Sequence, residues 1–191
     1  MNIREIHNLS VEMGIKADFR GEGGVRKFLD EKIKKYNEMK EAQKEEFDRE
    51  ALENPYLDSR IYNTSEDKDI KKALAGIDIE PAEILISKEI ENIDLIIAHH
   101  PLGKGLAHLA DVMDLQCDVL NYYGVPINIA EGMMKERISE VARGVNSANH
   151  ERTVDAAKIM KVSLMNSHTP CDNLAAKYLR ELIELKNKYI H

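Results

Sequence analysis

Short apolar runs alternate with helical patterns from Lys71 onward, and this alternation constrains the fold more than any other feature. The run IDLIIA (93–98) is continuous and ends at His99, as expected for a parallel strand covered on both faces. Three further runs also indicate strands: KALAGIDI (72–79), PINIA (126–130) and VSLMN (162–166). The spacing predicts βαβ units and therefore an α/β fold, with a mostly parallel sheet flanked by helices.

The first part of the chain predicts an N-terminal helical segment. One helix is expected to end near Gly14, the GEGG at 21–24 indicates a flexible stretch, and a long helix is expected from Val25 to about Asn54. Part of that helix, KEAQKEEFDREALE (40–53), is charged on nearly all sides. Such a helix is usually a solvated face, and a partner-binding surface is the alternative. We therefore divide the chain into a helical segment (1–70) and an α/β metal-binding domain (71–191).

Helices are also expected between and after the strands of the second part. Pro81 opens the first of them, and Gly124 ends another that begins near Leu106. Glu131 is expected to follow a strand, where it either lines the rim of the sheet or caps the helix over 131–144. Asn149 is a candidate cap for the next helix, and a final helix follows the run at 162–166.

Composition and charge exclude several classes of protein. The 191 residues are 43% hydrophobic and 32% charged, which is typical of a globular chain. A net charge of −7 makes nucleic acid an improbable partner, because like charges repel. The two cysteines, Cys117 and Cys171, lie far apart in the sequence, so we expect both to be reduced thiols. With no apolar run near the ~20 residues of a membrane span and no signal-peptide pattern, we expect a cytoplasmic protein with no membrane partner.

Two segments place polar side chains where strands are expected to end, and ligands bind at the carboxyl ends of strands in open α/β sheets. The first is AHHPLGKG (98–105), in which His99 and His100 follow the strand directly. Adjacent residues of a regular strand point to opposite sides, so these histidines would serve two neighbouring ions, or one ion where the chain turns at Pro101 and Gly103. A structural or surface pair is the alternative.

The second segment is NSHTPCDN (166–173), which carries His168 and Asp172 before a helix. Thr169 or Asp172 could equally cap that helix. Imidazole and carboxylate together suit first-row divalent ions, so we expect zinc, iron or manganese at His99, His100 and Asp172. The remaining histidines have no such placement, and we interpret them as ordinary surface or packing residues; they are His7, His108, His150 and His191.

With these motifs in hand, the chain resembles the NGG-interacting-factor (Nif-three-like) family, also labelled GTP cyclohydrolase I type 2. GIDIEPAEILISKEIENIDLIIAHHPLG (76–103) is similar to the family's strand–helix–strand unit and its His-His motif, and SHTPCDNLAAKYL (167–179) to its H-T-x-x-D motif. The resemblance covers about residues 71–180. Family members normally continue into a second half that supplies a further histidine and an acidic ligand, so the chain is expected to match the N-terminal half.

The resemblance implies a two-metal centre inside a ring-shaped homo-oligomer, commonly a hexamer built from dimers. It makes His99, His100 and Asp172 metal ligands, puts His168 at or beside the site, and suggests that Asp78 lies close by. The function expected from it is a metal-dependent hydrolase acting on a nucleotide or another phosphorylated small molecule. His168 would then be the general base or an orienting residue. The alternative is a non-catalytic binding or scaffold protein stabilised by metal.

Overall fold

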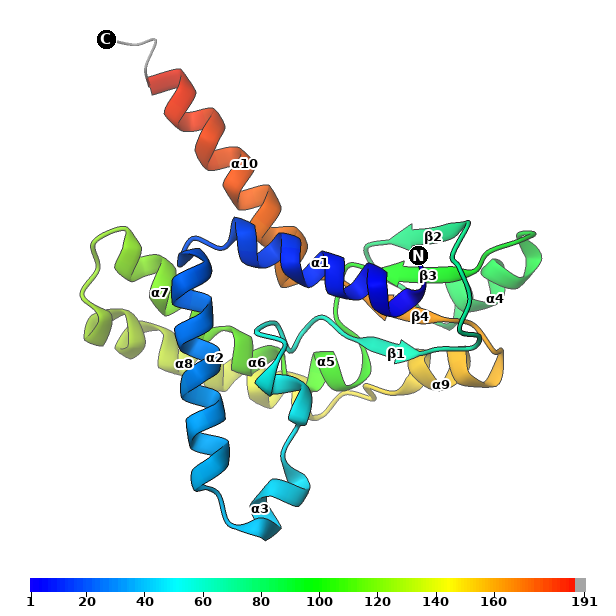
Figure 1. The fold of residues 1–191 in the computed structure, drawn as a ribbon, viewed down its shortest axis with the longest axis horizontal. Coiled ribbons are helices and arrows are strands. Elements are labelled where there is room, and N and C mark those ends of the chain that lie inside the picture. Colours follow the sequence, from blue (N-terminus) through cyan, green and yellow to red (C-terminus); the bar gives the residue numbers. More distant parts are fainter. Residues whose placement is uncertain (188–191) are drawn as a thin grey trace.

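The computed structural model describes residues 1–187 and shows one four-stranded sheet flanked by helices (Figure 1). The strands are β1 (Ile61–Asn63), β2 (Ala73–Gly76), β3 (Leu95–Ala98) and β4 (Leu164–Asn166). The helices are α1 (Ile3–Ala17), α2 (Gly21–Glu38), α3 (Glu41–Glu46), the 3₁₀ turn η1 (Arg49–Leu52), α4 (Pro81–Glu89), α5 (Gly103–Ala107), α6 (Leu109–Val112), α7 (Asp114–Tyr122), α8 (Ile127–Asn146), α9 (Arg152–Ile159) and α10 (Thr169–Asn187).

The strand order is β1-β4-β3-β2. β2 pairs with β3 and β3 with β4 in parallel, whereas β1 pairs with β4 in the antiparallel direction. The predicted α/β class with a mostly parallel sheet is therefore confirmed. In this register the last residues of the three parallel strands, Gly76, Ala98 and Asn166, lie side by side. Whatever follows these residues is brought to one edge of the sheet.

The central strands β3 and β4 are covered on both faces, to which their alternate residues point, whereas Ala73 and Ala75 of the edge strand β2 are exposed. Ile96 and Leu164 pack towards α4 and α9 in the main core, which includes Ile84 and Ala157. Leu95 and Met165 pack on the other face against Ile3 of α1, which crosses that side of the sheet in Figure 1. This two-sided burial explains the continuous apolar runs in the sequence.

One predicted strand is helical in the structure, and one strand of the sheet was not predicted. The run at 126–130, predicted as a strand, forms the N-cap and first residues of α8, in which Ile127 and Ile129 are half-exposed. An apolar run this short is compatible with either structure, and Pro126 is suited to a helix start. Glu131 therefore lies inside α8 and does not follow a strand. The unpredicted strand is β1, which has only three residues and depends on pairing with β4.

The helices of the first half are divided differently from the prediction. The GEGG at 21–24 forms the first turn of α2 and is no linker, with Gly21 in the left-handed region at φ +70°. The predicted helix over 25–54 is α2, α3 and η1, separated by extended residues at Met39 and Phe47. Likewise, the predicted helix from Leu106 to Tyr123 is three short helices beginning at Gly103.

Two predicted helix boundaries are also corrected. Gly14 lies inside α1 and does not end it. Its role is close packing: a Cβ at this position would lie 2.7 Å from the Cα of Pro170, at the start of α10. Asn149 is not the cap of α9, which begins at Arg152 after Glu151. None of the helices in residues 1–187 combines the length and the apolar character that a membrane span requires.

A buried polar network joins the first helix to the last. Asp18, just after α1, accepts hydrogen bonds from the Tyr56 hydroxyl (2.8 Å) and from the Arg20 guanidinium (2.8 Å). The Asn173 amide of α10 donates to the Gly14 carbonyl oxygen (3.3 Å) and to the Tyr56 hydroxyl oxygen (3.2 Å). Burial alone would raise the pKa of Asp18, but the Arg20 contacts outweigh it and hold that pKa below its usual value.

Substituting Gly14 tests how closely α1 and α10 pack. Gly14→Ala should reduce the free energy of unfolding by about 1–3 kcal/mol, because the added methyl group meets the backbone of Pro170. The matched control is Gly132→Ala in α8, where no atom lies within 4 Å of the new Cβ. That change should raise stability by about 0.5–1 kcal/mol. Equal effects in urea denaturation would contradict the close contact.

Candidate metal centre

The parallel strands place the candidate residues at one edge of the sheet. His99 and His100 follow β3, His168 follows β4 after one residue, and Asp78 follows β2 after one residue. Both histidines remain hydrogen-bonded to the end of β2. The His99 amide donates to the Gly76 carbonyl oxygen (2.8 Å), and the His100 amide donates to the Ile77 carbonyl oxygen (2.9 Å). The register of three strands therefore fixes the spacing of the site.

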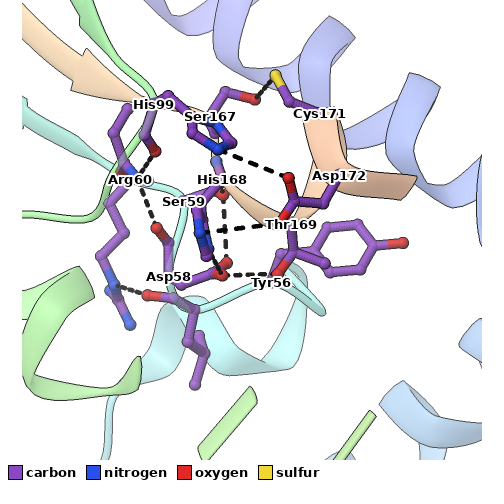
Figure 2. Close-up of polar contacts among 12 residues, drawn as sticks. Tyr56, Asp58, Ser59, Arg60, His99, Ser167, His168, Thr169, Cys171 and Asp172 are labelled. Carbon is purple, nitrogen blue, oxygen red and sulfur yellow. Dashed lines mark hydrogen bonds and ion pairs between the residues drawn. The ribbon is translucent and has the colours of Figure 1, made fainter. Parts of the chain in front are cut away.

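The predicted residues lie together. One ring nitrogen from each of His99, His100 and His168 lies within 4.8 Å of the others. Asp172, in the first turn of α10, approaches this cluster with Oδ1 3.5 Å from Nε2 of His99 and Oδ2 3.7 Å from Nε2 of His168 (Figure 2). The adjacent histidines thus reach the same region and do not point to opposite sides of the strand end.

Each histidine uses Nδ1 for a hydrogen bond to oxygen. The acceptors are the Ser167 carbonyl oxygen for His99 (3.2 Å), Asp78 for His100 (2.6 Å) and Asp58 for His168 (2.7 Å). Carbonyl and ionised carboxylate oxygens can only accept, so Nδ1 carries the proton in each neutral ring. Nε2 is then the nitrogen with a free lone pair, which is the form that binds a metal ion.

Asp58 is the functional residue that sequence reasoning missed. Its side chain is fully buried, and Oδ2 also accepts a hydrogen bond from the Thr169 hydroxyl (2.6 Å). Ser59, next to it, accepts through Oγ from the His168 amide (2.9 Å). The carboxylate therefore fixes both the His168 ring and the start of α10 (Figure 2). No pattern in ENPYLDSR (53–60) indicates this role, because the partners lie 110 residues along the chain.

The site is buried at one side and open at the other. The side chains of His99 and His168 are 29% and 22% exposed, whereas those of His100 and Asp78 are 49% and 74% exposed. Asp172 is also exposed, at 58%. The open side allows a small molecule to reach the cluster. Asp78 lies where the family resemblance suggested, hydrogen-bonded to His100.

The other polar candidates lie in ordinary surroundings. His7 is buried and bonds to the Ser59 carbonyl oxygen, and His150 bonds to that of Val145. His108 contacts Asp111 on its own helical segment. Cys171 is exposed, with Sγ 3.3 Å from the Ser167 hydroxyl. His191 lies outside the described residues.

The donor set fits a divalent metal ion. The cluster offers three imidazoles, each hydrogen-bonded through Nδ1, and a carboxylate that faces two of them. Imidazole and carboxylate are ligand types of first-row divalent ions. The hydrogen bonds to Nδ1 are those that orient metal-binding histidines in proteins. The arrangement therefore has the features of a metal centre in both its ligands and the groups behind them.

The Asp58–His168 pair is testable without metal. Burial alone would lower the pKa of His168, but the hydrogen bond to Asp58 outweighs it and the pKa is raised. The pair therefore stabilises the metal-free fold below about pH 6.5, the ordinary histidine pKa, and this stabilisation is lost as pH rises through the raised value.

Asp58→Asn should lower the His168 pKa, as measured by NMR titration, and weaken this pH dependence. Asp78→Asn, which alters only the His100 contact, is the control and should leave the His168 titration unchanged.

Comparison with known proteins supports this interpretation of the fold. The crystal structure of a NIF3 superfamily protein from Sphaerobacter thermophilus is similar to this chain, with a TM-score of 0.56 and 30% sequence identity. The similarity covers 60% of this chain and 41% of the other, so the chain spans less than half the length of that protein. No protein-family model and no curated protein matches the chain. The chain therefore has a NIF3-like fold, with a histidine cluster able to bind metal at the edge of its sheet.

Proposed function

We propose that this protein binds two divalent first-row ions and acts as a metal-dependent hydrolase on a nucleotide or another phosphorylated small molecule. The observation that carries the proposal is the position of Asp172. Its two carboxylate oxygens face two different imidazoles, Oδ1 towards His99 and Oδ2 towards His168. A carboxylate with each oxygen beside a separate nitrogen donor is suited to bridging two ions.

His99, His100, His168 and Asp172 would hold the metal. Zinc, iron and manganese are the candidate ions, since imidazole and carboxylate ligands suit all three. Bound there, the ions would supply Lewis acidity and lower the pKa of a water molecule for attack on a phosphorus centre. A metal-ligand role for His168 is favoured by its place in the cluster, and the general-base role is the alternative.

The residues around the ligands prepare the site before any ion binds. Asp58 holds the proton of His168 on Nδ1, and the Ser167 carbonyl oxygen does the same for His99, so that Nε2 of each ring faces Asp172. The exposed His100–Asp78 pair lies on the open side, where a substrate would arrive. As the family resemblance implies, we propose that the chain forms a homo-oligomer, and that it does so in the cytoplasm.

A non-catalytic role is the second candidate. The family resemblance implies further ligands from a second half, and the similarity covers only 41% of the NIF3 superfamily protein. In this case metal would stabilise the fold or an assembly. Asp172 would then join α10 to the end of β3 through an ion, adding a connection between two elements that are otherwise held by packing and hydrogen bonds.

Metal content is the first measurement. Protein purified without chelator should contain about two equivalents of a first-row metal, measured by elemental analysis. His100→Ala and Asp172→Ala should lose most of it, whereas His108→Ala, a histidine away from the cluster, should retain it. Asp58→Asn should weaken binding by about 10–100-fold, because the His168 ring loses its orienting acceptor. Parent protein with little metal would refute the proposed centre.

Activity separates the two candidate functions. A hydrolase should release phosphate or nucleoside from a panel of phosphorylated small molecules, and folded His100→Ala should lose that turnover. Equal turnover in this variant would rule out hydrolysis at the cluster. If no substrate is turned over and chelation lowers the melting temperature, the scaffold role is supported. If chelation changes neither melting nor assembly, metal has no structural role.

A further inference from the structure

A buried amide side chain lies beside the candidate metal centre, at the last residue of β4. The Asn166 side chain is fully buried, and its oxygen and its nitrogen each have two hydrogen-bond partners. Oδ1 accepts from the Arg60 amide (2.9 Å) and from the Tyr62 hydroxyl (2.8 Å). Nδ2 donates to the carbonyl oxygens of Asp58 (2.6 Å) and His99 (3.4 Å). The side chain therefore uses its whole hydrogen-bonding capacity inside the fold.

The Tyr62 hydroxyl extends this network to the loop that follows β3. While it donates to Asn166, it also accepts from the Leu102 amide (3.0 Å), two residues beyond His100. Burial raises the pKa of Tyr62, so the hydroxyl keeps the proton that it donates. Gly105 provides the space for it, because a Cβ at that position would overlap the Tyr62 hydroxyl oxygen. The hydroxyl thus joins β1 to the loop that carries two of the three histidines.

The Tyr62–Asn166 pair contacts three segments that shape the site. It bonds to the loop after β3 at His99 and Leu102, and to the segment before β1 at Asp58. The loop after β4 begins directly after Asn166. Together these segments supply the histidine rings of the cluster and the buried carboxylate that orients one of them.

The acceptors that hold two of the rings lie next to this pair. His99 is held by the carbonyl oxygen of Ser167, which is the residue after Asn166. His168 is held by the carboxylate of Asp58, and the backbone of Asp58 is itself hydrogen-bonded to the Asn166 amide. A shift of Asn166 would therefore displace both acceptors from their rings at once.

We propose that the Tyr62–Asn166 pair is a positioning unit, which keeps His99 and His168 in the form that carries the proton on Nδ1 and leaves Nε2 free for metal. The inference rests on the proposed function, since the pair acts through ligands of the metal centre. A purely structural role is the alternative, in which the pair stabilises the sheet and leaves the rings unaffected. The two roles differ in what removal of the hydroxyl changes, which is the state of the rings or only the stability of the fold.

Tyr62→Phe tests the unit, because it removes the hydroxyl and retains the ring that packs against the main core. In metal-free protein, at a pH where the rings are neutral, NMR of the imidazole nitrogens should show His99 and His168 protonated on Nδ1 in the parent. The variant should show a mixture of the two tautomers. Zinc affinity, measured by competition with a chromophoric chelator, should fall about tenfold. Gly105→Ala, which displaces the hydroxyl without removing it, should have the same two effects.

Ser163→Ala is the matched control. It removes a buried hydroxyl directly before β4, at the other end of that strand, where Oγ accepts from the Ser65 amide (3.0 Å). The melting temperature should fall because a backbone amide loses its acceptor, while the tautomers and the zinc affinity should not change. Unchanged tautomers in Tyr62→Phe, or an equal change in Ser163→Ala, would overturn the proposal.

The parent protein separates a failure of this inference from a failure of the proposed function. If the parent and Tyr62→Phe bind zinc equally well, the positioning role is overturned and the metal centre stands. If the parent binds no zinc but its uniform tautomers are lost in Tyr62→Phe, the proposed function is overturned and the positioning of the rings is supported.

Discussion

The candidate site depends on the hydrogen bonds that the buried carboxylate of Asp58 accepts. This carboxylate accepts hydrogen bonds from Nδ1 of His168 and from the Thr169 hydroxyl, so one group positions both the His168 ring and the first turn of α10. Asp172 is in that turn, and its position relative to His99 therefore follows from the same carboxylate. A buried charge is costly unless it is satisfied, and the hydrogen bonds to Asp58 make this arrangement stable.

The three histidines of the cluster are supported unequally. A backbone carbonyl oxygen holds His99, a buried carboxylate holds His168, and an exposed carboxylate holds His100. A negatively charged acceptor makes the ring a stronger donor to metal than a neutral carbonyl does. The two oxygens of the Asp172 carboxylate thus face rings that are held at Nδ1 by different kinds of acceptor.

Sequence reasoning succeeded where the signal is local. The apolar run at 93–98 and the residues after it predicted β3 and the placement of His99 and His100 at the sheet edge. It failed where tertiary contacts decide. The run at 126–130 is equally compatible with a strand and with a helix start, and only its exposure in α8 distinguishes them. Asp58 could not be found, because a lone aspartate in a loop carries no sign of a partner that lies far along the chain.

The distance in sequence between Asp58 and His168 has a consequence for how the protein matures. Their hydrogen bond spans 110 residues, and contacts of such long range form late in folding because loop closure must come first. During synthesis, His99 and His100 emerge well before the strand and helix that carry their companions. The three histidines can therefore come together only in the nearly complete fold, so an ion that needs all of them as ligands could bind only then and not in the nascent chain.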